Sequence, residues 1–538
     1  MEYSFASSYG KPYVGQYTPP GCQFNRVIMN FTVVSKGRQF DRLALMYFGD
    51  TEVWRTSTAE PSKSQGIRWT YMKDMTAILS LWKSPQKLIF DLGNIVDANL
   101  TGAFNTTLTA TFFESTVNTN AGPPSDLIIP ISKPSSADDV ASQFSLPHDN
   151  ATSIIRNFPQ NARRAVFSVS ACGQADEEFW WSNALQSDVY AFNASIGPMP
   201  GFSPFREVQV LIDGQLAGVQ WPYPVIFTGG VNPNVHRPLV GIDTFDLKEH
   251  EIDISPFLPV LCDGEQHNFT MLVAGLDDNG GTSAALTQTV DNSWYVTGKI
   301  FVWLDPAGSV TTGDRPTVQA SAPTISVFQR LTHTANGTNM TLDYSTDVSR
   351  YMSISGRIVT KDGPSNVSWT QRLTYTNVGS VTSAGNSSAN TLLIQGTDMA
   401  NRGSSNIYQA IYSYPLFANS TTDVTPDDNM TQFAHIIQGK HEVVSGSAVF
   451  PTGLEAFASL GKPFAAATLN TTQEGNATYF FPGGGHGNST VRNVSTAQVF
   501  SFGGVSSADQ GEEVQLYFRN VTASNDSVAY NRETVDGT

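Results

Sequence analysis

The chain has 538 residues, with 31 basic and 47 acidic side chains and a formal net charge of -16. This surplus of negative charge argues against nucleic acid or an anionic membrane as a partner, and the chain contains no apolar run of about 18 residues that would span a bilayer. Aromatic residues make up 11%, and 44 Gly and 29 Pro accompany many Thr, Ser, Asn and Val residues. This composition is typical of short β-strands joined by turns, so we expect an all-β protein.

Cysteine content and glycosylation signals bear on the compartment. Cys22, Cys172 and Cys262 allow at most one intramolecular disulfide, so they do not decide whether the compartment is oxidising. Asn-x-Ser/Thr sequons are frequent and include Asn30, Asn99, Asn105, Asn150, Asn193, Asn268, Asn336, Asn419 and Asn520. We therefore expect a secreted, N-glycosylated monomer. The opening MEYSFASSYG has no signal-peptide pattern, which we interpret as the start of a trimmed mature sequence.

Residues 1–132 have the strand and turn spacing of a β-sandwich. Strands are predicted at Gln23–Val33, Leu43–Tyr47, Val53–Ser57, Ile67–Tyr71, Lys87–Leu92 and Leu108–Glu114. A short helical turn is expected over Asp74–Trp82, with Asp74 as its N-cap.

Three further regions follow. Residues 133–160 are polar and contain SKPSSADD, which is typical of a linker or surface connection. Residues 161–308 alternate apolar and polar positions and predict a second antiparallel sandwich. Residues 309–538 predict a third, β-rich domain without a chemical motif, in which the glycine-rich run at 483–487 favours a turn over a phosphate loop.

Two charged clusters stand out. Asp41 and Arg42 precede one predicted strand and Glu60 follows the next, and a tight turn at Gly49-Asp50 joins the two strands. A hairpin of this kind brings Asp41 and Glu60 to the same end of a sheet. An ion pair capping a strand remains the plainer interpretation of Asp41 and Arg42.

The second cluster is the segment DEEFWWSN at 176–183, in which carboxylates run into aromatic side chains. We expect Trp180 or Trp181 to form a platform for a sugar, although a sandwich also buries tryptophan in its core. The same two interpretations apply to Trp69 and Trp221. No histidine or cysteine pair has the spacing of metal ligands, so we predict neither a metal nor a cofactor.

Several segments in this order resemble the peptide:N-glycanase A family, the acidic plant and fungal amidases that release N-glycans from glycopeptides. They are GRQFDR, RTSTAEP, GIRWTYMKD, DEEFWWSN, PFREVQVLIDG, PVIFTGGVNP and HRPLV. The resemblance implies hydrolysis of the amide bond between Asn and the proximal N-acetylglucosamine, giving Asp and a glycosylamine. It implies N-glycosylated peptides and denatured glycoproteins as substrates.

A more distant resemblance to the bacterial peptide:N-glycosidase F implies two adjacent jelly rolls with the site at their junction. On this resemblance Asp41 is the general base, Arg42 stabilises charge, and Arg206 and Arg237 are active-site arginines. A bacterial glutamate is missing before Phe205, so Glu177 or Glu178 is expected to replace it, and the sequence does not choose between them. A second bacterial glutamate aligns loosely near Asn94, which leaves Glu60 as its substitute. Asn183 joins the expected substrate-binding residues.

Two other functions remain open at this point. The chain could be a non-catalytic carbohydrate-binding protein of the cell wall, or a glycoside hydrolase that acts on N-glycans with paired carboxylates.

Overall fold

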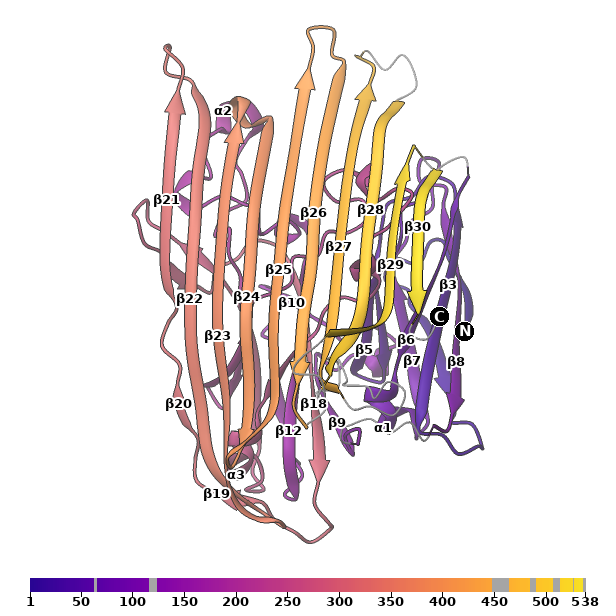
Figure 1. Ribbon diagram of the computed structural model, residues 1–538, viewed down its shortest axis with the longest axis vertical. Helices are drawn as coiled ribbons and strands as arrows, with labels where there is room; N and C mark the ends of the chain where they lie inside the picture. The colour runs from indigo at the N-terminus through magenta and orange to yellow at the C-terminus, as the bar shows by residue number, and fades with distance from the viewer. Residues whose placement is uncertain are drawn as a thin grey trace.

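A computed structural model of the chain describes residues 1–61, 65–115, 123–447, 464–483, 490–506, 513–525 and 527–535. Long strands of one broad sheet run along the longest axis; the N-terminal β-sandwich, in indigo, lies at its right-hand edge near β29 (Glu513–Ser524) and β30 (Ser527–Val535), and the second sandwich lies behind the sheet (Figure 1). Most of the glycine-rich run, 484–487, lies outside the described residues. Among the described residues, none of the helices is long and apolar enough to cross a bilayer.

The first sandwich is a jelly roll of two four-stranded antiparallel sheets with orders β1-β8-β3-β6 and β2-β7-β4-β5. Its strands are β1 Glu2–Phe5, β2 Tyr13–Tyr17, β3 Arg26–Lys36, β4 Leu43–Phe48, β5 Thr51–Ser57, β6 Ile67–Asp74, β7 Gln86–Leu92 and β8 Ala103–Phe113. All six predicted strands are present, whereas β1 and β2 were not predicted.

The predicted helical turn is also present, as η1 Thr76–Ile78 and α1 Leu79–Trp82. The carboxylate of Asp74 accepts a hydrogen bond of 2.8 Å from the backbone N–H of Thr76. The N-cap position is Met75, one residue later than predicted, and Asp74 supports the turn through this hydrogen bond and takes no part in the site described below.

The second sandwich has the same strand order as the first. One sheet has the order β10-β18-β12-β15, with β9 also paired to β18, and the other has the order β11-β16-β13-β14, with β17 paired to β16. The strands are β9 Leu127–Ile131, β10 Phe144–Leu146, β11 Thr152–Ile155, β12 Ala162–Gly173, β13 Glu207–Ile212, β14 Gln215–Gln220, β15 His250–Asp253, β16 His267–Asp277, β17 Ala285–Thr287 and β18 Trp294–Leu304.

The predicted linker at 133–160 is therefore not a plain connection. It contains η2 Ser136–Asp138 and supplies two strands of the second jelly roll, since β10 pairs with β18 and β11 pairs with β16. These strands have three and four residues, too few for alternation to reveal them in a polar segment.

Short helical turns fill the long connections of the second jelly roll. They are η3 Ala175–Glu177, η4 Gln186–Asp188, α2 Asn193–Ile196, η5 Pro233–His236, η6 Ile242–Phe245, η7 Ser255–Phe257 and α3 Leu258–Leu261.

The C-terminal region forms a single 12-stranded antiparallel sheet within the described residues. Its strands are β19 Thr312–Gly313, β20 Thr317–Gln319, β21 Thr324–His333, β22 Asn339–Thr360, β23 Gly363–Thr382, β24 Ser387–Arg402, β25 Ser405–Val424, β26 Met430–Ser445, β27 Phe464–Phe481, β28 Thr490–Ser506, β29 Glu513–Ser524 and β30 Ser527–Val535, with η8 Ser383–Gly385 between β23 and β24.

One face of this sheet packs against the second jelly roll. Gln371 accepts a hydrogen bond from the backbone of Val219 and donates one back to it, at 2.9 and 3.0 Å. Arg350 pairs with the buried Glu207 at 2.5 Å. Because these buried polar groups bond across the contact, they hold the sheet and the jelly roll in one relative position.

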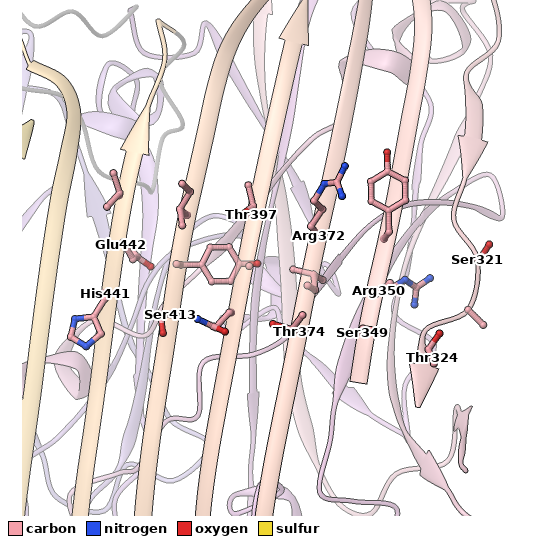
Figure 2. A pocket seen from close by; sticks show the side chains of 18 of the residues that line it. Ser321, Thr324, Ser349, Arg350, Arg372, Thr374, Thr397, Ser413, His441 and Glu442 are labelled. Atoms are coloured by element: carbon pink, nitrogen blue, oxygen red, sulfur yellow. The ribbon is translucent and has the colours of Figure 1, made fainter. Parts of the chain in front are cut away.

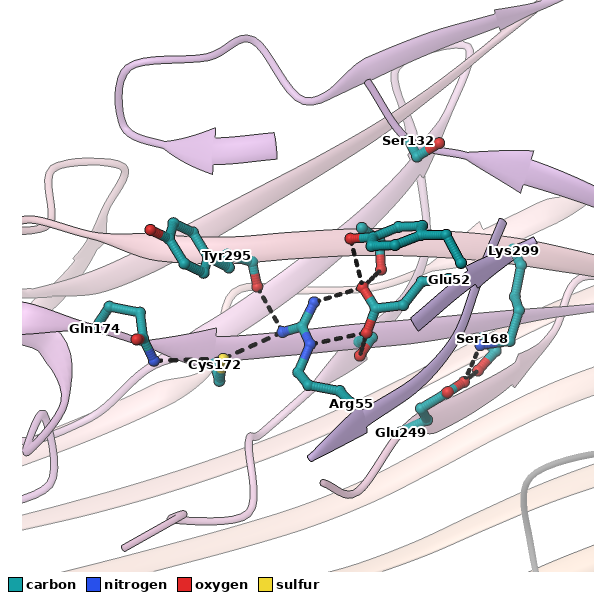
Figure 3. Close-up of polar contacts among 12 residues, drawn as sticks. Glu52, Arg55, Ser132, Ser168, Cys172, Gln174, Glu249, Tyr295 and Lys299 are labelled. Carbon is teal, nitrogen blue, oxygen red and sulfur yellow. Dashed lines mark hydrogen bonds and ion pairs between the residues drawn. The ribbon is translucent and has the colours of Figure 1, made fainter. Parts of the chain in front are cut away.

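A buried polar network joins the two jelly rolls (Figure 3). Glu52 and Arg55 of β5 form a two-fold ion pair with both distances at 2.8 Å. From the second jelly roll, Thr297 donates to Glu52 at 2.7 Å, and the backbone oxygen of Tyr295 accepts from Arg55 at 2.9 Å. Cys172 accepts from Arg55 at 3.2 Å and is a free thiol, as are Cys22 and Cys262.

A buried carboxyl predicts how stability depends on pH. Glu251 of β15 is buried, and its Oε1 has no hydrogen-bond partner among the described residues. Burial raises the pKa of Glu251 from 4.5 to about 7, although Lys248 and His250 oppose the shift. The folded state therefore binds this proton more tightly than the unfolded state, and the stability it gives is lost as pH rises from 4.5 through about 7.

We expect Glu251→Gln to remove this loss. The free energy of unfolding of the variant, relative to that of the unchanged protein, should rise by roughly 3 kcal/mol between pH 4 and pH 8. Urea unfolding at both pH values measures it, with the exposed Glu2→Gln as a control that leaves the difference constant. A difference for Glu251→Gln that is independent of pH would contradict the prediction.

Candidate active site

Two carboxylates of the first jelly roll meet at one end of a hairpin. Asp41 precedes β4 and Glu60 follows β5, and these strands pair from Leu43 with Ser57 onward. Hydrogen bonds between Arg42 and Thr58 extend the pairing, at 2.9 Å from the Thr58 N–H and 2.8 Å from the Arg42 N–H. The hairpin thus places Asp41 and Glu60 at the same sheet end, as its turn predicted.

Gly229 of the second jelly roll lies against both carboxylates. A Cβ atom on Gly229 would be 2.1 Å from Oδ1 of Asp41 and 3.0 Å from Oε2 of Glu60. The backbone N–H of Gly229 also donates a hydrogen bond to Asp41. Only a residue without a side chain allows the two jelly rolls to approach this closely with both carboxylates in place.

Arg237 and Thr228, also from the second jelly roll, hold Glu60. Nη2 of Arg237 lies 3.2 Å from Oε1 of Glu60, and Thr228 Oγ1 accepts from the Glu60 N–H at 3.0 Å. Nε of Arg237 is buried and has no hydrogen-bond partner among the described residues. The site therefore contains a cationic donor that protein atoms do not satisfy.

Glu178 is a third carboxylate of the site. It follows the η3 turn, and its side chain forms no ion pair or hydrogen bond among the described residues. Burial raises the pKa of Glu178 to about 7, and the negative charge of Asp41 adds to the shift. Asp41 and Glu178 are thus close enough for their charges to interact.

The three carboxyl groups differ in how they hold protons. Burial raises the pKa of Asp41, but its own backbone N–H, Arg42 and the Gly229 N–H oppose the shift. Burial raises the pKa of Glu60 to about 7, with Arg237 opposing the rise and Asp41 adding to it. Asp41 therefore has several groups that favour its negative charge, whereas no cation among the described residues opposes the rise in the pKa of Glu178.

Arg42 is fixed beside Asp41. Its Nη2 donates to Gln39 at 2.8 Å and its Nε donates to Asn94 at 3.3 Å. The guanidinium lies 6.0 Å from the centre of the Phe40 ring, which is 48% exposed. Phe40 is thus an exposed aromatic side chain beside the Arg42 guanidinium.

The structure separates Glu177 from Glu178 and corrects the expectation for Glu177. Glu177 is fully buried and pairs with Arg206 through two contacts of 2.6 and 2.7 Å. Trp294 donates to the same carboxylate at 2.6 Å. Arg206 also donates to backbone oxygens of Gly201 and Phe205, so the pair is part of the core and neither member reaches a ligand.

The expected sugar platforms are also corrected. Trp180 and Trp181 are 3% and 2% exposed, because the C-terminal sheet covers them. Trp221 is buried and donates to Glu207 at 3.0 Å, and Trp69 stacks on Phe245 in the core. Asn183 is buried and donates to the backbone of Asp176 at 2.7 Å. None of these five side chains faces the carboxylates as a ligand surface.

Sequence reasoning missed Gly229, Thr228 and the open ring of Phe40. The Gly229-Gly230 pair was a visible signal for close backbone approach, whereas Thr228 carried none. In the described part of the chain, no group of three or more His, Cys, Asp or Glu side chains is arranged to hold a metal ion.

Comparison with known proteins gives family matches along most of the chain. A family model described as peptide N-acetyl-beta-D-glucosaminyl asparaginase amidase A matches residues 1–321, and one described as PNGase_A C-terminal domain matches residues 343–416. A curated protein of Prunus dulcis, peptide-N4-(N-acetyl-beta-glucosaminyl)asparagine amidase A, is 36% identical over 331 residues. The match covers 58% of this chain and 55% of the Prunus protein, so the chain spans about half the length of that relative.

Among solved structures, PNGase F of Flavobacterium meningosepticum, described as a glycosylasparaginase, is similar at 12% identity with a TM-score of 0.35. The similarity covers 57% of this chain and 94% of the bacterial chain.

The effect of the Asp41 charge on the pKa values of Glu60 and Glu178 can be tested without any substrate. Asp41→Asn removes the negative charge that favours the protonated forms of Glu60 and Glu178, so the pKa of both should fall below about 7. Side-chain carbon NMR titration measures both values. The exposed Asp97→Asn in the same jelly roll should move neither, and two unchanged pKa values in Asp41→Asn would refute the coupling.

Proposed function

The chain belongs to the peptide N-acetyl-beta-D-glucosaminyl asparaginase amidase A family, and on that premise we propose that it hydrolyses the amide bond between Asn and the proximal N-acetylglucosamine of N-glycans. The proposed substrates are N-glycosylated peptides and denatured glycoproteins. The products are a peptide with Asp at that position and a glycosylamine. The observation that carries the proposal is the meeting of Asp41 and Glu60 of the first jelly roll at Gly229 of the second, with Glu178 close enough for its charge to interact with that of Asp41.

Hydrolysis of an amide needs an activated water, stabilisation of the oxyanion and a proton for the departing nitrogen. In our proposal Asp41 is the general base, since its charge has the support of Arg42 and of the Gly229 N–H. It takes a proton from water as the oxygen attacks the amide carbon. The carbonyl oxygen then becomes an oxyanion within reach of a cationic donor, for which the unsatisfied Nε of Arg237 is suited.

Glu178 is the proposed general acid. Its pKa of about 7 keeps it protonated in acid, and no cation among the described residues draws the proton away. When the carbon–nitrogen bond breaks, Glu178 donates its proton to the nitrogen of the leaving glycosylamine. Glu60 with Arg237 orients the other side of the site, and the exposed ring of Phe40 offers an apolar face to the sugar.

We also propose that the protein is secreted and itself N-glycosylated. Among the sequon asparagines named above, six lie at exposed positions, which supports this: Asn99, Asn105, Asn150, Asn193, Asn268 and Asn336.

The proposed base gives the first test. We expect Asp41→Asn to keep the fold and to lower the rate of glycan release from a denatured glycopeptide by at least about a hundredfold. Mass spectrometry of the peptide follows the conversion of glycosylated Asn to Asp, and Asp97→Asn is the matched control. If the unmodified protein leaves one N-acetylglucosamine on the Asn, it is a glycoside hydrolase instead of an amidase. If it leaves the glycopeptide unchanged, only a sugar-binding function remains.

Close approach at Gly229 gives the second test. The Cβ of Gly229→Ala would overlap Oδ1 of Asp41, so the carboxylate must move. A displacement of this size is expected to lower the rate of glycan release by about a hundredfold. Gly21→Ala is the control, because an added Cβ there meets no atom within 4 Å. Full activity in Gly229→Ala would argue against Asp41 as the base.

A further inference from the structure

The C-terminal sheet has one covered face and one open face. Along β22 to β26, alternate residues such as Arg350, Leu373, Tyr412 and Glu442 are buried on the side of the second jelly roll. The residues between them point the other way, away from both jelly rolls. This outward face is independent of the carboxylate site described above.

A groove of about 820 Å³ crosses the open face from β22 to β27. Its size is within the range of small-molecule sites in proteins. Figure 2 shows its side chains in rows that run across the strands, with His441, Ser413 and Thr374 in one row and Thr397 and Arg372 in the next.

Strand register explains the first row. Directly paired positions on six successive strands carry side chains with hydrogen-bonding groups but no carboxylate: Ser349, Thr374, Gln395, Ser413, His441 and Asn470. His441 and Asn470 bond to each other at 3.1 Å. The side chains of the other four have no hydrogen-bond partner among the described residues. We call these six residues the polar row.

The neighbouring row lies two residues away along each strand and is more apolar. Its paired positions are Tyr351, Arg372, Thr397, Ile411 and Val443. Tyr351 and Ile411 are each 49% exposed, and the guanidinium of Arg372 lies 4.7 Å from the centre of the Tyr351 ring. We call these five residues the apolar row.

One end of the groove is closed by the edge of the sheet. β20 and β21 both pair with the same side of β22, β20 at Ser353–Ser355 and β21 from Ser349 onward toward the start of β22. The segment of chain that joins β20 to β21 is therefore not paired with β22 between Ser349 and Ser353. Ser321, Ala322 and Thr324 from this segment line the groove. The groove is therefore bounded beside Tyr351 and continues toward Asn470.

The lining determines which ligand chemistry fits. Hydroxyl and amide side chains both donate and accept hydrogen bonds, and among the outward groove residues only Arg372 and His441 can carry a positive charge, while none is a carboxylate. The nearby carboxylate of Glu442 points to the covered face, where Lys248 and Tyr414 bind it. A neutral molecule with many hydroxyl groups on its edges and apolar faces between them matches a polar row beside an apolar row.

We propose that this groove binds an oligosaccharide. The hydroxyl groups of the sugar bond to the polar row, and its apolar faces lie on Tyr351, Ile411 and Val443. Five strand spacings of about 4.8 Å give the polar row a length of about 24 Å, enough for several linked sugar units. The proposed site does not depend on the amidase function, because it shares no residue with the carboxylate cluster.

Binding of a free oligomannose N-glycan to the full chain tests the proposal by titration calorimetry. We expect Tyr351→Ala and Gln395→Ala each to raise the Kd of the groove at least about tenfold. Ser413→Trp, which fills the groove, should abolish that binding event. Val378→Ala is the matched control, since Val378 is exposed on the same face of β23 outside the groove, and it should leave the Kd unchanged.

The same variants separate this proposal from the amidase. Tyr351→Ala should release glycans from a short glycopeptide at the unchanged rate, whereas Asp41→Asn should bind the free glycan in the groove as the unmodified protein does. A chain that binds in the groove but releases no glycan would refute the amidase alone.

Three results would overturn the groove proposal. In the first, Tyr351→Ala binds the glycan as tightly as the unmodified protein does. In the second, the unmodified protein binds dextran sulfate, or the short peptide without its glycan, at least as tightly as it binds the glycan. In the third, sedimentation shows a dimer of the unmodified protein that the Tyr351→Ala substitution dissociates. The last two would assign the face to an anion, a peptide or a second copy of the chain.

Discussion

The buried pair of Glu52 and Arg55 sets the position of the two jelly rolls. Removing both charges from water costs several kcal/mol per ion, which their attraction offsets only with further hydrogen bonds. Those bonds come from Thr297 and Tyr295 of the other jelly roll. Burial by itself would raise the pKa of Glu52, but Arg55 and the hydrogen bonds lower it below its ordinary value. The network is complete only when the jelly rolls are docked in one orientation, and β5 continues from it directly toward Glu60.

Local sequence signals were enough for the half of the site that one hairpin builds. Asp41, Arg42 and Glu60 lie at the ends of β4 and β5, and the turn at Gly49-Asp50 fixes their register. Alternation predicted the second sandwich, and the resemblance to known families added its jelly-roll topology, the site at the junction and Arg237. These inferences needed only a short-range pattern or an ordered set of motifs. They did not depend on which side chains become buried under distant parts of the chain.

Distant parts of the chain decided what the sequence left open. Glu177 and Glu178 are neighbours, but Arg206 and Trp294 bind the first, whereas the second has no such partner among the described residues and interacts with the charge of Asp41. Trp180 and Trp181 were expected to bind sugar, yet Asn377, far along the chain, bonds to the Trp181 backbone and the sheet closes over both rings. Likewise, alternation in the C-terminal strands is equally consistent with a sandwich and with one sheet that has an open face.

Stability and the proposed chemistry share a pH range for a physical reason. Burial raises the pKa of Glu60 and Glu178, each to about 7, and interaction with the negative charge of Asp41 adds to both shifts. The same shift means that folding binds these protons, so the stability they give is present below their unfolded pKa and is lost as pH rises through about 7. A protonated Glu178 is therefore both the form that the fold favours in acid and the form that the proposed general acid requires.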